Sequence, residues 1–380
     1  MLHPAQNSQT SIRRRHCLIW GAAGLVAPAR SVLAVGSPGS SEDAHAGLHQ
    51  TIAQAIDQGA AQAPLTHAVL VEQRRRIVVE AYFTADDKPS GDWFARTVAF
   101  DPSTLHDMRS VSKSVVGLLV GIAHGRGHLD RERPVMDWFP EHAALATPER
   151  RAMRLEHLLT MTAGFEWDET SVSYANLANS ETRLGLSADP VKYVLSRDMV
   201  AAPGRRFAYS GGATLLLAEI VERATGRAID DYARDMLFEP LGIQRSEWRR
   251  HIFWDKPLPY SGLRLTPRSM VRLGRLALDG GRHGDEALVP AGWVAELQRA
   301  QVIETGQGLR YGWQWWVGRV AQGPGTGMDW FAGLGNGGQV LMVVPALDAI
   351  IAVTAGRYNA PASGRASLAI CRRVIEAMGR

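Results

Sequence analysis

The order of β-rich and helical segments along the chain constrains its fold most. Two β-rich runs, residues 67–70 and 77–83, flank a polar turn near the N-terminal end, which predicts a hairpin. Further β-rich runs at 311–317, 339–344 and 349–354 lie near the C-terminal end, and the long segment between shows helical spacing. This order predicts an α+β fold in which an antiparallel sheet is built from both ends of the chain, with a helical domain inserted between them.

Apolar residues at helical spacing, with glycine or proline as stop signals, predict the helices. They cover residues 45–58, 115–122, 155–161, 190–199, 214–225, 229–238, 270–278, 290–300 and 365–378. We therefore expect a sheet domain flanked by terminal helices, formed by residues 45–105 and 285–380, and a mainly helical domain of residues 106–284.

The first 34 residues have the pattern of an export signal. Arg13, Arg14 and Arg15 precede a short apolar stretch, and Ala34 ends a Val-Leu-Ala sequence typical of a cleavage site. The paired arginines indicate a twin-arginine type, and residues 35–44 suggest a Gly/Ser-rich linker. We expect a periplasmic or secreted protein. A basic disordered tail is the alternative.

The leader also accounts for the net charge. The formal charge of the chain is +4, and residues 1–34 hold four arginines and no acid, so the remainder is close to neutral. The basic composition therefore gives no support to nucleic-acid binding. No run of 18 apolar residues occurs, so we expect no stable membrane insertion after the leader is removed.

Cysteine and histidine usage argues against a metal site. The two cysteines are Cys17, in the leader, and Cys371, so the mature chain would hold a single thiol. The chain has no Cys/His cluster with zinc spacing and no His-Glu-x-x-His motif. We expect neither a metal nor another cofactor.

Ser110 and Lys113 form a Ser-x-x-Lys tetrad at the start of an apolar run that extends to Ile122. In a helix, residues three apart lie on one face, so hydroxyl and amine would be neighbours. Burial disfavours the charged form of an amine, so we expect Lys113 to act as a neutral base that activates Ser110 as a nucleophile. A chance tetrad with a solvated lysine is the alternative.

Three further motifs follow the tetrad in order. They are His-Leu-Leu-Thr-Met-Thr-Ala-Gly-Phe at 157–165, Gly-Arg-Arg-Phe-Ala-Tyr-Ser-Gly-Gly at 204–212, and Gly-Leu-Gly-Asn-Gly-Gly-Gln at 333–339. Together with the tetrad they resemble the serine β-lactamase-related hydrolases: class C β-lactamases, D-aminopeptidases, family VIII esterases and 6-aminohexanoate-dimer hydrolase. The resemblance runs from about residue 65 to the C-terminus, and the Gly-Gly-Gln ending is closest to the 6-aminohexanoate-dimer hydrolase branch.

The resemblance implies a β-lactamase/transpeptidase-like fold and a set of catalytic roles. Ser110 would be the nucleophile, and Lys113 and Tyr209 would transfer protons. The backbone N–H groups of Ser110 and Asn336 would form the oxyanion hole, where a lost donor costs roughly 10²–10³ in rate. A core aromatic is the alternative for Tyr209, and a flexible hairpin turn is the alternative for the segment of Asn336.

Several residues near these motifs are candidates for substrate contact. Trp167 could line the pocket or lie on a surface loop, and Gly337 and Gly338 would let the backbone approach a ligand. Trp313 and Trp315 alternate on a predicted strand and would share one face. We interpret these two tryptophans as core residues rather than substrate walls.

The motifs depart from the β-lactamases at two places. Gly211 stands where the tyrosine motif usually has asparagine, and residues 333–338 lack the usual lysine or histidine that receives a β-lactam carboxylate. We therefore expect anionic β-lactams to be poor substrates, although Arg264 or Arg310 could supply the missing charge.

The sequence thus predicts an exported serine hydrolase that cleaves a small-molecule ester or amide through an acyl-enzyme on Ser110. A D-aminopeptidase, a penicillin-recognising peptidase or a β-lactamase is the alternative within the enzymes. A non-catalytic member of the fold that binds peptide or cell-wall fragments is the alternative outside them. The chain has no Gly-x-Ser-x-Gly motif, which argues against an α/β-hydrolase.

Overall fold

The computed structural model describes residues 30–32, 42–63, 65–253, 255–323 and 326–379. The predicted export signal, apart from Arg30–Val32, and most of the predicted linker lie outside the described residues. None of the described helices is long and apolar enough to cross a membrane.

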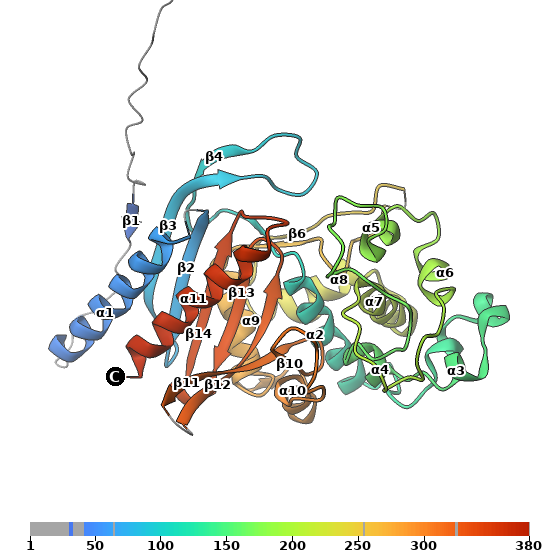
Figure 1. Cartoon of the computed structure of the whole chain (residues 1–380). Coiled ribbons are helices and arrows are strands. Elements are labelled where there is room, and N and C mark those ends of the chain that lie inside the picture. Colours follow the sequence, from blue (N-terminus) through green and yellow to red (C-terminus); the bar gives the residue numbers. More distant parts are fainter. Residues whose placement is uncertain (1–29, 33–41, 64, 254, 324–325, 380) are drawn as a thin grey trace, which may run out of the picture.

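An antiparallel sheet built from both ends of the chain forms one side of the molecule (Figure 1). Its strand order is β1 (Arg30–Val32), β3 (Arg76–Asp87), β2 (Thr66–Gln73), β14 (Ala349–Ala355), β13 (Gln339–Val344), β12 (Thr326–Gly335), β11 (Trp316–Gly323) and β10 (Arg310–Tyr311), with β4 (Arg96–Ala99) beside β3. The predicted hairpin of β2 and β3 joins the C-terminal strands at β14, where Leu70 lies opposite Ala352. Every residue of β13 and β14 is buried, which explains why all but Gln339 and Thr354 are apolar.

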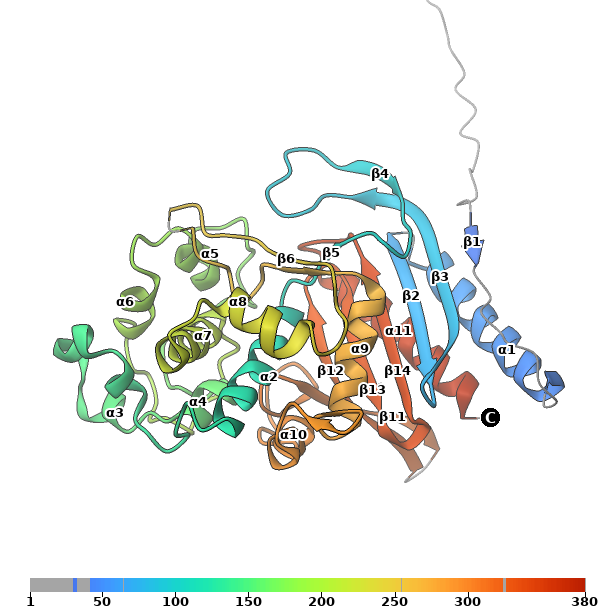
Figure 2. The ribbon, with the colours of Figure 1, turned by 180° about the vertical axis from the view of Figure 1, so that it is seen from behind.

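Helices cover both faces of the sheet. On one face α1 (Glu42–Ala61) and α11 (Pro361–Met378) pack against each other, and on the other face α9 (Pro267–Leu278) packs on β2, β13 and β14 (Figures 1 and 2). Thr266 caps α9 by accepting a hydrogen bond from the Ser269 N–H. The predicted domain boundary at residue 284 assigned α9 to the helical domain, but its apolar side is buried on the sheet.

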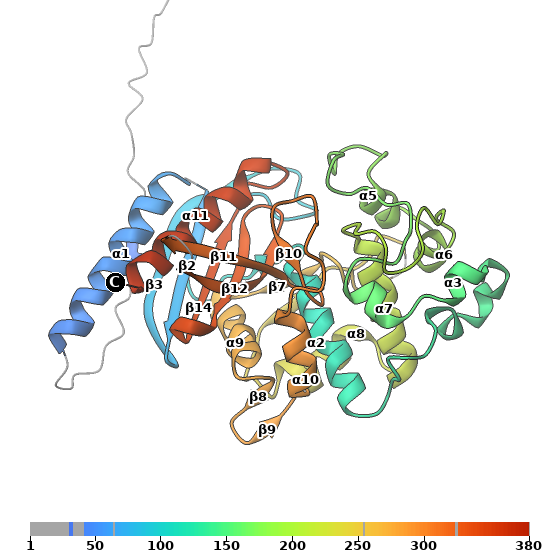
Figure 3. The ribbon, with the colours of Figure 1, turned by 60° about the horizontal axis from the view of Figure 1, so that its bottom comes forward.

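The remaining helices form the second part of the molecule, and α2 (Val111–Gly125) lies between them and the sheet (Figure 3). They are α3 (Pro148–Arg151), α4 (Leu155–Leu159), α5 (Ser180–Gly185), α6 (Pro190–Leu195), α7 (Gly211–Thr225) and α8 (Ile229–Ala233) with a π-helical turn at Arg234–Phe238. Helix α10 (Ala291–Gln298) packs against α2 on the side of the sheet. Short strands β5 (His106–Asp107), β7 (Leu263–Leu265) and β6 (Ser246–Trp248) form a small sheet, and β8 (Arg282–His283) pairs with β9 (Glu286–Ala287). Helix α2 contacts β12 on one side and α7 on the other, which buries residues 111–123 completely.

Each predicted helix is present, but the predicted strand 311–317 is wrong. The chain leaves the sheet after Tyr311 and re-enters it at Trp316, with Gln314 at a φ of 61° between them. The Trp313 ring packs against Trp293 at 4.6 Å between centroids, whereas the Trp315 ring packs against Phe331 at 5.4 Å. The two tryptophans therefore do not share a strand face, although both are buried as predicted.

Candidate active site

The N-terminal end of α2 places Ser110 and Lys113 side by side. Ser110 immediately precedes the helix, Lys113 lies in its first turn, and Nζ of Lys113 is 3.0 Å from Oγ of Ser110. Both residues are buried. Arg109, just before Ser110, has a φ of 49°, an uncommon conformation for a side chain of this size and one that often occurs at functional sites.

Lys113 is held as an ammonium. Its Nζ donates to Oγ of Ser110, to Oε2 of Glu181 at 3.1 Å and to the carbonyl of Tyr260 at 3.1 Å, and only the charged form has three N–H groups. Burial lowers the pKa of Lys113, but the carboxylates of Glu181 and Glu169 raise it, and the net pKa lies above the ordinary value. The expectation of a neutral Lys113 in the resting enzyme is therefore wrong, because these carboxylates cannot be located from local sequence.

Glu169 is the second carboxylate at this lysine. Its Oε2 accepts hydrogen bonds from Nε1 of Trp167 and from the Gly211 N–H, both at 2.7 Å, and its Oε1 lies 3.5 Å from Nζ of Lys113. Burial, and then the negative charge of Glu181, raise the pKa of Glu169 to about 8. At neutral pH Glu169 therefore keeps its proton and does not add a negative charge beside Lys113.

Replacing Glu169 with glutamine should change how stability depends on pH. The unfolded chain releases the Glu169 proton near pH 4.5, whereas the folded protein keeps it to about pH 8, so wild-type stability falls as pH rises across this range. Glutamine cannot ionise, so the free energy of unfolding of Glu169→Gln should rise relative to wild type by more than about 1 kcal/mol between pH 5 and pH 9. Urea unfolding at both pH values measures this change.

Glu156→Gln serves as the control for that measurement. Its free energy of unfolding should depend on pH as that of wild type does, because the Glu156 side chain is 58% exposed. Parallel curves for Glu169→Gln and wild type would show that Glu169 is already ionised at pH 5.

Glu181 reaches Lys113 from the first turn of α5. The side-chain oxygen of Asn179 accepts hydrogen bonds from the N–H groups of Glu181 and Thr182 and caps this short helix. Neither Glu181 nor Tyr260 was a sequence candidate, because neither belongs to a recognisable motif. Asn179 followed by a serine and a glutamate is a weak capping signal that occurs at many helix starts.

Tyr209 completes the cluster around Ser110. Its ring centre is 5.0 Å from Nζ of Lys113, and its ring packs against Trp316 at 5.2 Å. Burial raises the pKa of Tyr209, while the charge of Lys113 opposes this effect. Tyr209 is therefore a phenol in the resting state, and the structure brings Ser110, Lys113 and Tyr209 together.

The glycine-rich end of β12 runs beside the first turn of α2. A Cβ atom at position 333 would lie 2.9 Å from Oγ of Ser114, so only glycine allows this approach. Strand β12 pairs with β11 only as far as Ala332, and with β13 as far as Gly335, so residues 333–335 have no strand partner on one edge. Asn336 begins the following turn, and its amide side chain bonds to Asn359.

The three residues suggested for substrate contact, Trp167, Gly337 and Gly338, are all buried. Trp167 is 8% exposed, packs its ring edge against Tyr193, and holds Glu169 through Nε1. Its side chain therefore supports Glu169 rather than lining an open pocket. Gly337 and Gly338 have φ values of 97° and 101°, which only glycine adopts readily.

Both arginines suggested as a substitute cation already have carboxylate partners. Nε of Arg264 lies 3.0 Å from Asp107, and Nη2 of Arg310 lies 3.7 Å from Asp329. Neither guanidinium is therefore an unpaired charge waiting for an anionic substrate.

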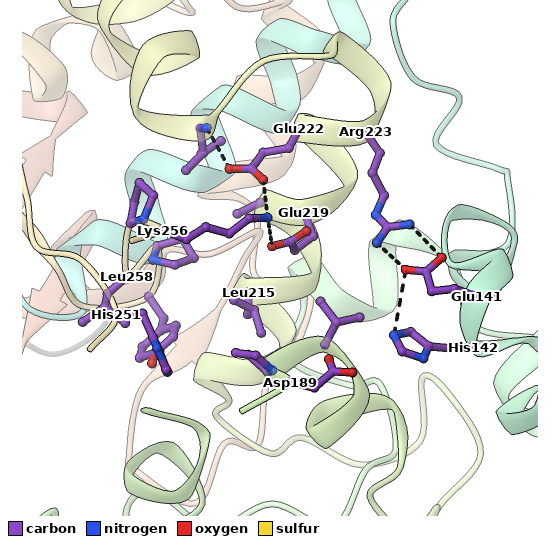
Figure 4. Close-up of a pocket in the computed structure, with 17 residues that line it drawn as sticks. Glu141, His142, Asp189, Leu215, Glu219, Glu222, Arg223, His251, Lys256 and Leu258 are labelled. Carbon is purple, nitrogen blue, oxygen red and sulfur yellow. Dashed lines mark hydrogen bonds and ion pairs between the residues drawn. The ribbon is translucent and has the colours of Figure 1, made fainter. Parts of the chain in front are cut away.

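A cavity of about 300 Å³ lies between α6, α7, His251 and residues 256–260 (Figure 4). Its walls are mostly apolar, and Lys256 bridges Glu219 at 2.7 Å and Glu222 at 2.9 Å. Tyr260 lines this cavity and also accepts the Lys113 hydrogen bond, but Ser110, Lys113 and Tyr209 do not line it. No group of three His, Cys, Asp or Glu side chains among the described residues is arranged to hold a metal ion.

Comparisons with known proteins identify the family of the chain. The Beta-lactamase family profile matches residues 50–370. The chain is 27% identical over 269 residues to 6-aminohexanoate-dimer hydrolase of Paenarthrobacter ureafaciens, which covers 66% of each protein, just under two thirds of that relative. It is 28% identical over 289 residues to penicillin-binding protein 4 of Amycolatopsis lactamdurans, which covers 67% of this chain and 73% of the relative.

A solved structure shows the same fold. EstCE1, described as a hydrolase with promiscuous acyltransferase activity, superposes with a TM-score of 0.65 at 17% identity, over 86% of this chain and 99% of that chain. The chain therefore belongs to the Beta-lactamase family of serine hydrolases, which includes esterases, amidases and penicillin-binding proteins. The predicted superfamily and the predicted α+β fold are confirmed.

Proposed function

We propose that this protein hydrolyses small esters or linear amides through a covalent acyl-enzyme on Ser110. The observation that carries the proposal is the Ser110–Lys113–Tyr209 cluster, in which Ser110 and Lys113 are buried and Tyr209 is partly buried. Oγ of Ser110 lies 3.0 Å from Nζ of Lys113 at the start of a buried helix, and the Tyr209 ring centre lies 5.0 Å from the same Nζ. A hydroxyl needs a neighbouring proton-transfer group to become a nucleophile, and this cluster supplies two.

The proposed reaction has two halves. Oγ of Ser110 attacks the substrate carbonyl, its proton passes through the Lys113–Tyr209 cluster to the leaving group, and the bond to that group breaks. Water then attacks the acyl carbon, one of its protons returns to Oγ, and the acid is released. No described residue accepts a hydrogen bond from the Ser110 N–H, so that donor is available to the oxyanion at the positive end of the α2 dipole. We assign the second donor to the edge at residues 333–336, which includes Asn336.

Esters and linear amides should be better substrates than β-lactams. The glycine-rich segment has no cation for a β-lactam carboxylate, and Arg264 and Arg310 are already paired. The loss of a charged partner in a desolvated site costs about 2–5 kcal/mol, or roughly 30- to 5,000-fold in specificity. On one enzyme preparation, kcat/KM for p-nitrophenyl butyrate should exceed that for nitrocefin by at least about tenfold. Faster nitrocefin turnover would instead place the activity with the β-lactamases.

We also propose that the protein works outside the cytoplasm. The support is the arginine-led leader that ends in Val-Leu-Ala before Val35. N-terminal sequencing of protein from its native host tests this, and an intact leader on a cytosolic product would exclude export.

A further inference from the structure

We propose that Glu181 is a positioning residue that holds Lys113 against Ser110 and accepts the proton that Lys113 passes on. We further propose that position 211 is glycine because a larger residue there would displace the Glu181 carboxylate. This inference rests on the proposed function, because it concerns how the Ser110 nucleophile is generated.

The space beside Gly211 is occupied by Glu181. A Cβ atom at position 211 would lie 2.5 Å from Oε2 of Glu181, closer than side-chain carbons approach oxygens. Gly211 is the first residue of α7 and does not have a positive φ, so its backbone conformation does not require glycine. The glycine that replaces the usual asparagine in the tyrosine motif therefore marks a place where another chain segment supplies the partner of Lys113.

The contacts of Lys113 explain why a proton acceptor is needed. As an ammonium, Lys113 cannot take the Ser110 proton unless it releases one of its own. Oε2 of Glu181 lies 3.1 Å from Nζ, on the same nitrogen that contacts Oγ of Ser110. When Oγ bonds to the substrate carbon, the Ser110 proton moves to Nζ and a proton on Nζ moves to Oε2. Lys113 remains an ammonium, and Glu181 becomes a neutral acid until the proton returns to the leaving group.

Glu169 is less suited to this role than Glu181. Its Oε2 already accepts two hydrogen bonds, from Trp167 and Gly211, and its Oε1 lies 3.5 Å from Nζ of Lys113. Since its pKa is raised to about 8, it also carries its own proton at neutral pH. Of the two glutamates, Glu181 is therefore the better placed to accept a proton from Lys113.

The first experiment replaces Glu181 with glutamine, which keeps the size of the side chain and removes its basic oxygen. We expect kcat for p-nitrophenyl butyrate at pH 7 to fall roughly 10²–10³-fold, within the range of general acid–base effects, with KM changed less than about threefold. Glu166→Gln is the matched control in the same chain segment, and it should retain wild-type kcat because the Glu166 side chain is 56% exposed.

The pH dependence of kcat distinguishes a Glu181 that accepts a proton from a Glu181 that only holds Lys113 in place. Without Glu181, the attack needs neutral Lys113, so kcat of Glu181→Gln should rise with pH between about 7 and 10 more steeply than kcat of wild type. The other titratable groups that face this pair are Glu169, Tyr174, Tyr209 and Tyr260. Glu169, whose pKa is about 8, can be removed from this comparison by introducing Glu169→Gln into both proteins. The steeper rise of kcat with pH should persist in that background.

The second experiment tests the room beside Gly211 and does not depend on the glutamine variant. Gly211→Asn should displace Glu181 and lower kcat at least about tenfold. The double variant Glu181→Ala, Gly211→Asn gives the asparagine amide the vacated space beside Lys113, so it should be at least about fivefold more active than Gly211→Asn alone. Two residues that share one contact are expected to be non-additive in this way.

The outcomes separate this inference from the proposed function. If wild-type protein neither hydrolyses the ester nor reacts with a fluorophosphonate at Ser110, the proposed function fails. If wild type does both while Glu181→Gln keeps more than about a third of wild-type kcat, the inference about Glu181 is overturned. Additive losses in the double variant would overturn the pairing of Gly211 with Glu181.

Discussion

Replacing Ser110 with alanine is expected to lower kcat for p-nitrophenyl butyrate by at least about 10³-fold and to abolish labelling by a fluorophosphonate. Without Oγ no acyl-enzyme forms, and only binding and oxyanion stabilisation remain, as in other serine hydrolases that lose their nucleophile. The fold should persist, because Ser110 contributes a small side chain whose contact to Lys113 is one of three around that ammonium. Ester turnover and gel-based labelling measure both effects.

Ser114→Ala is the matched control for this experiment. Ser114 lies one turn further along α2, is also buried, and donates its hydroxyl to the Gln314 carbonyl rather than contacting Lys113. It should keep its fluorophosphonate label and most of its activity. Equal labelling of Ser110→Ala and wild type would reject Ser110 as the nucleophile, and an unlabelled wild type would favour a non-catalytic binding member of the fold.

Replacing Lys113 with methionine is expected to remove activity and to destabilise the protein. We expect kcat to fall about 10²–10⁴-fold, the usual range for a proton-transfer group. The variant leaves Glu181 and Glu169 buried without their cation, which should cost about 3–5 kcal/mol of the free energy of unfolding near pH 9. The cost should shrink toward pH 5, because a buried carboxylate without its cation takes up a proton and loses its charge.

The sign of this pH effect follows from the wild-type lysine. Its pKa is raised above the ordinary value of 10.5, so its stabilising contribution is complete throughout pH 5–9, and any change in the difference comes from the carboxylates. Urea unfolding of both proteins at pH 5 and pH 9 measures this difference in the free energy of unfolding.

Lys256→Met is the matched control, because Lys256 also bridges two glutamates but its side chain is 50% exposed. This variant should lose less than about 1 kcal/mol of the free energy of unfolding. Equal stability of Lys113→Met and wild type at pH 9 would contradict the buried ion pair.

Local sequence was enough to predict that Ser110 and Lys113 lie side by side at the N-terminus of α2. Ser110 and Lys113 are three residues apart in an apolar helix, and helical geometry alone puts their functional groups within reach. The hairpin of β2 and β3 and the stop of α7 at Gly226, with its φ of 68°, also follow from neighbouring residues. These features depend on interactions within a few residues, which a sequence pattern can express.

The alternating tryptophans show where such patterns fail. Trp313 and Trp315 follow the period of a strand, but Gln314 between them donates through its amide to the Leu158 carbonyl and accepts from the hydroxyl of Thr214. These buried hydrogen bonds to the helical part of the molecule hold the chain out of the sheet after Tyr311. Tertiary contacts thus override a two-residue period, as is common for short segments.

The sequence by itself determined the family, the α+β order of elements and the Ser110–Lys113 pair, because each depends on motif order or on local geometry. Only the tertiary structure decided the charge of Lys113. Its two hydrogen-bond partners besides Ser110 lie far along the chain, with Glu181 68 positions away and Tyr260 147 positions away, and no local pattern encodes such contacts. Burial beside two carboxylates, rather than burial alone, sets the state of the amine, and that balance exists only after the helices have packed around it.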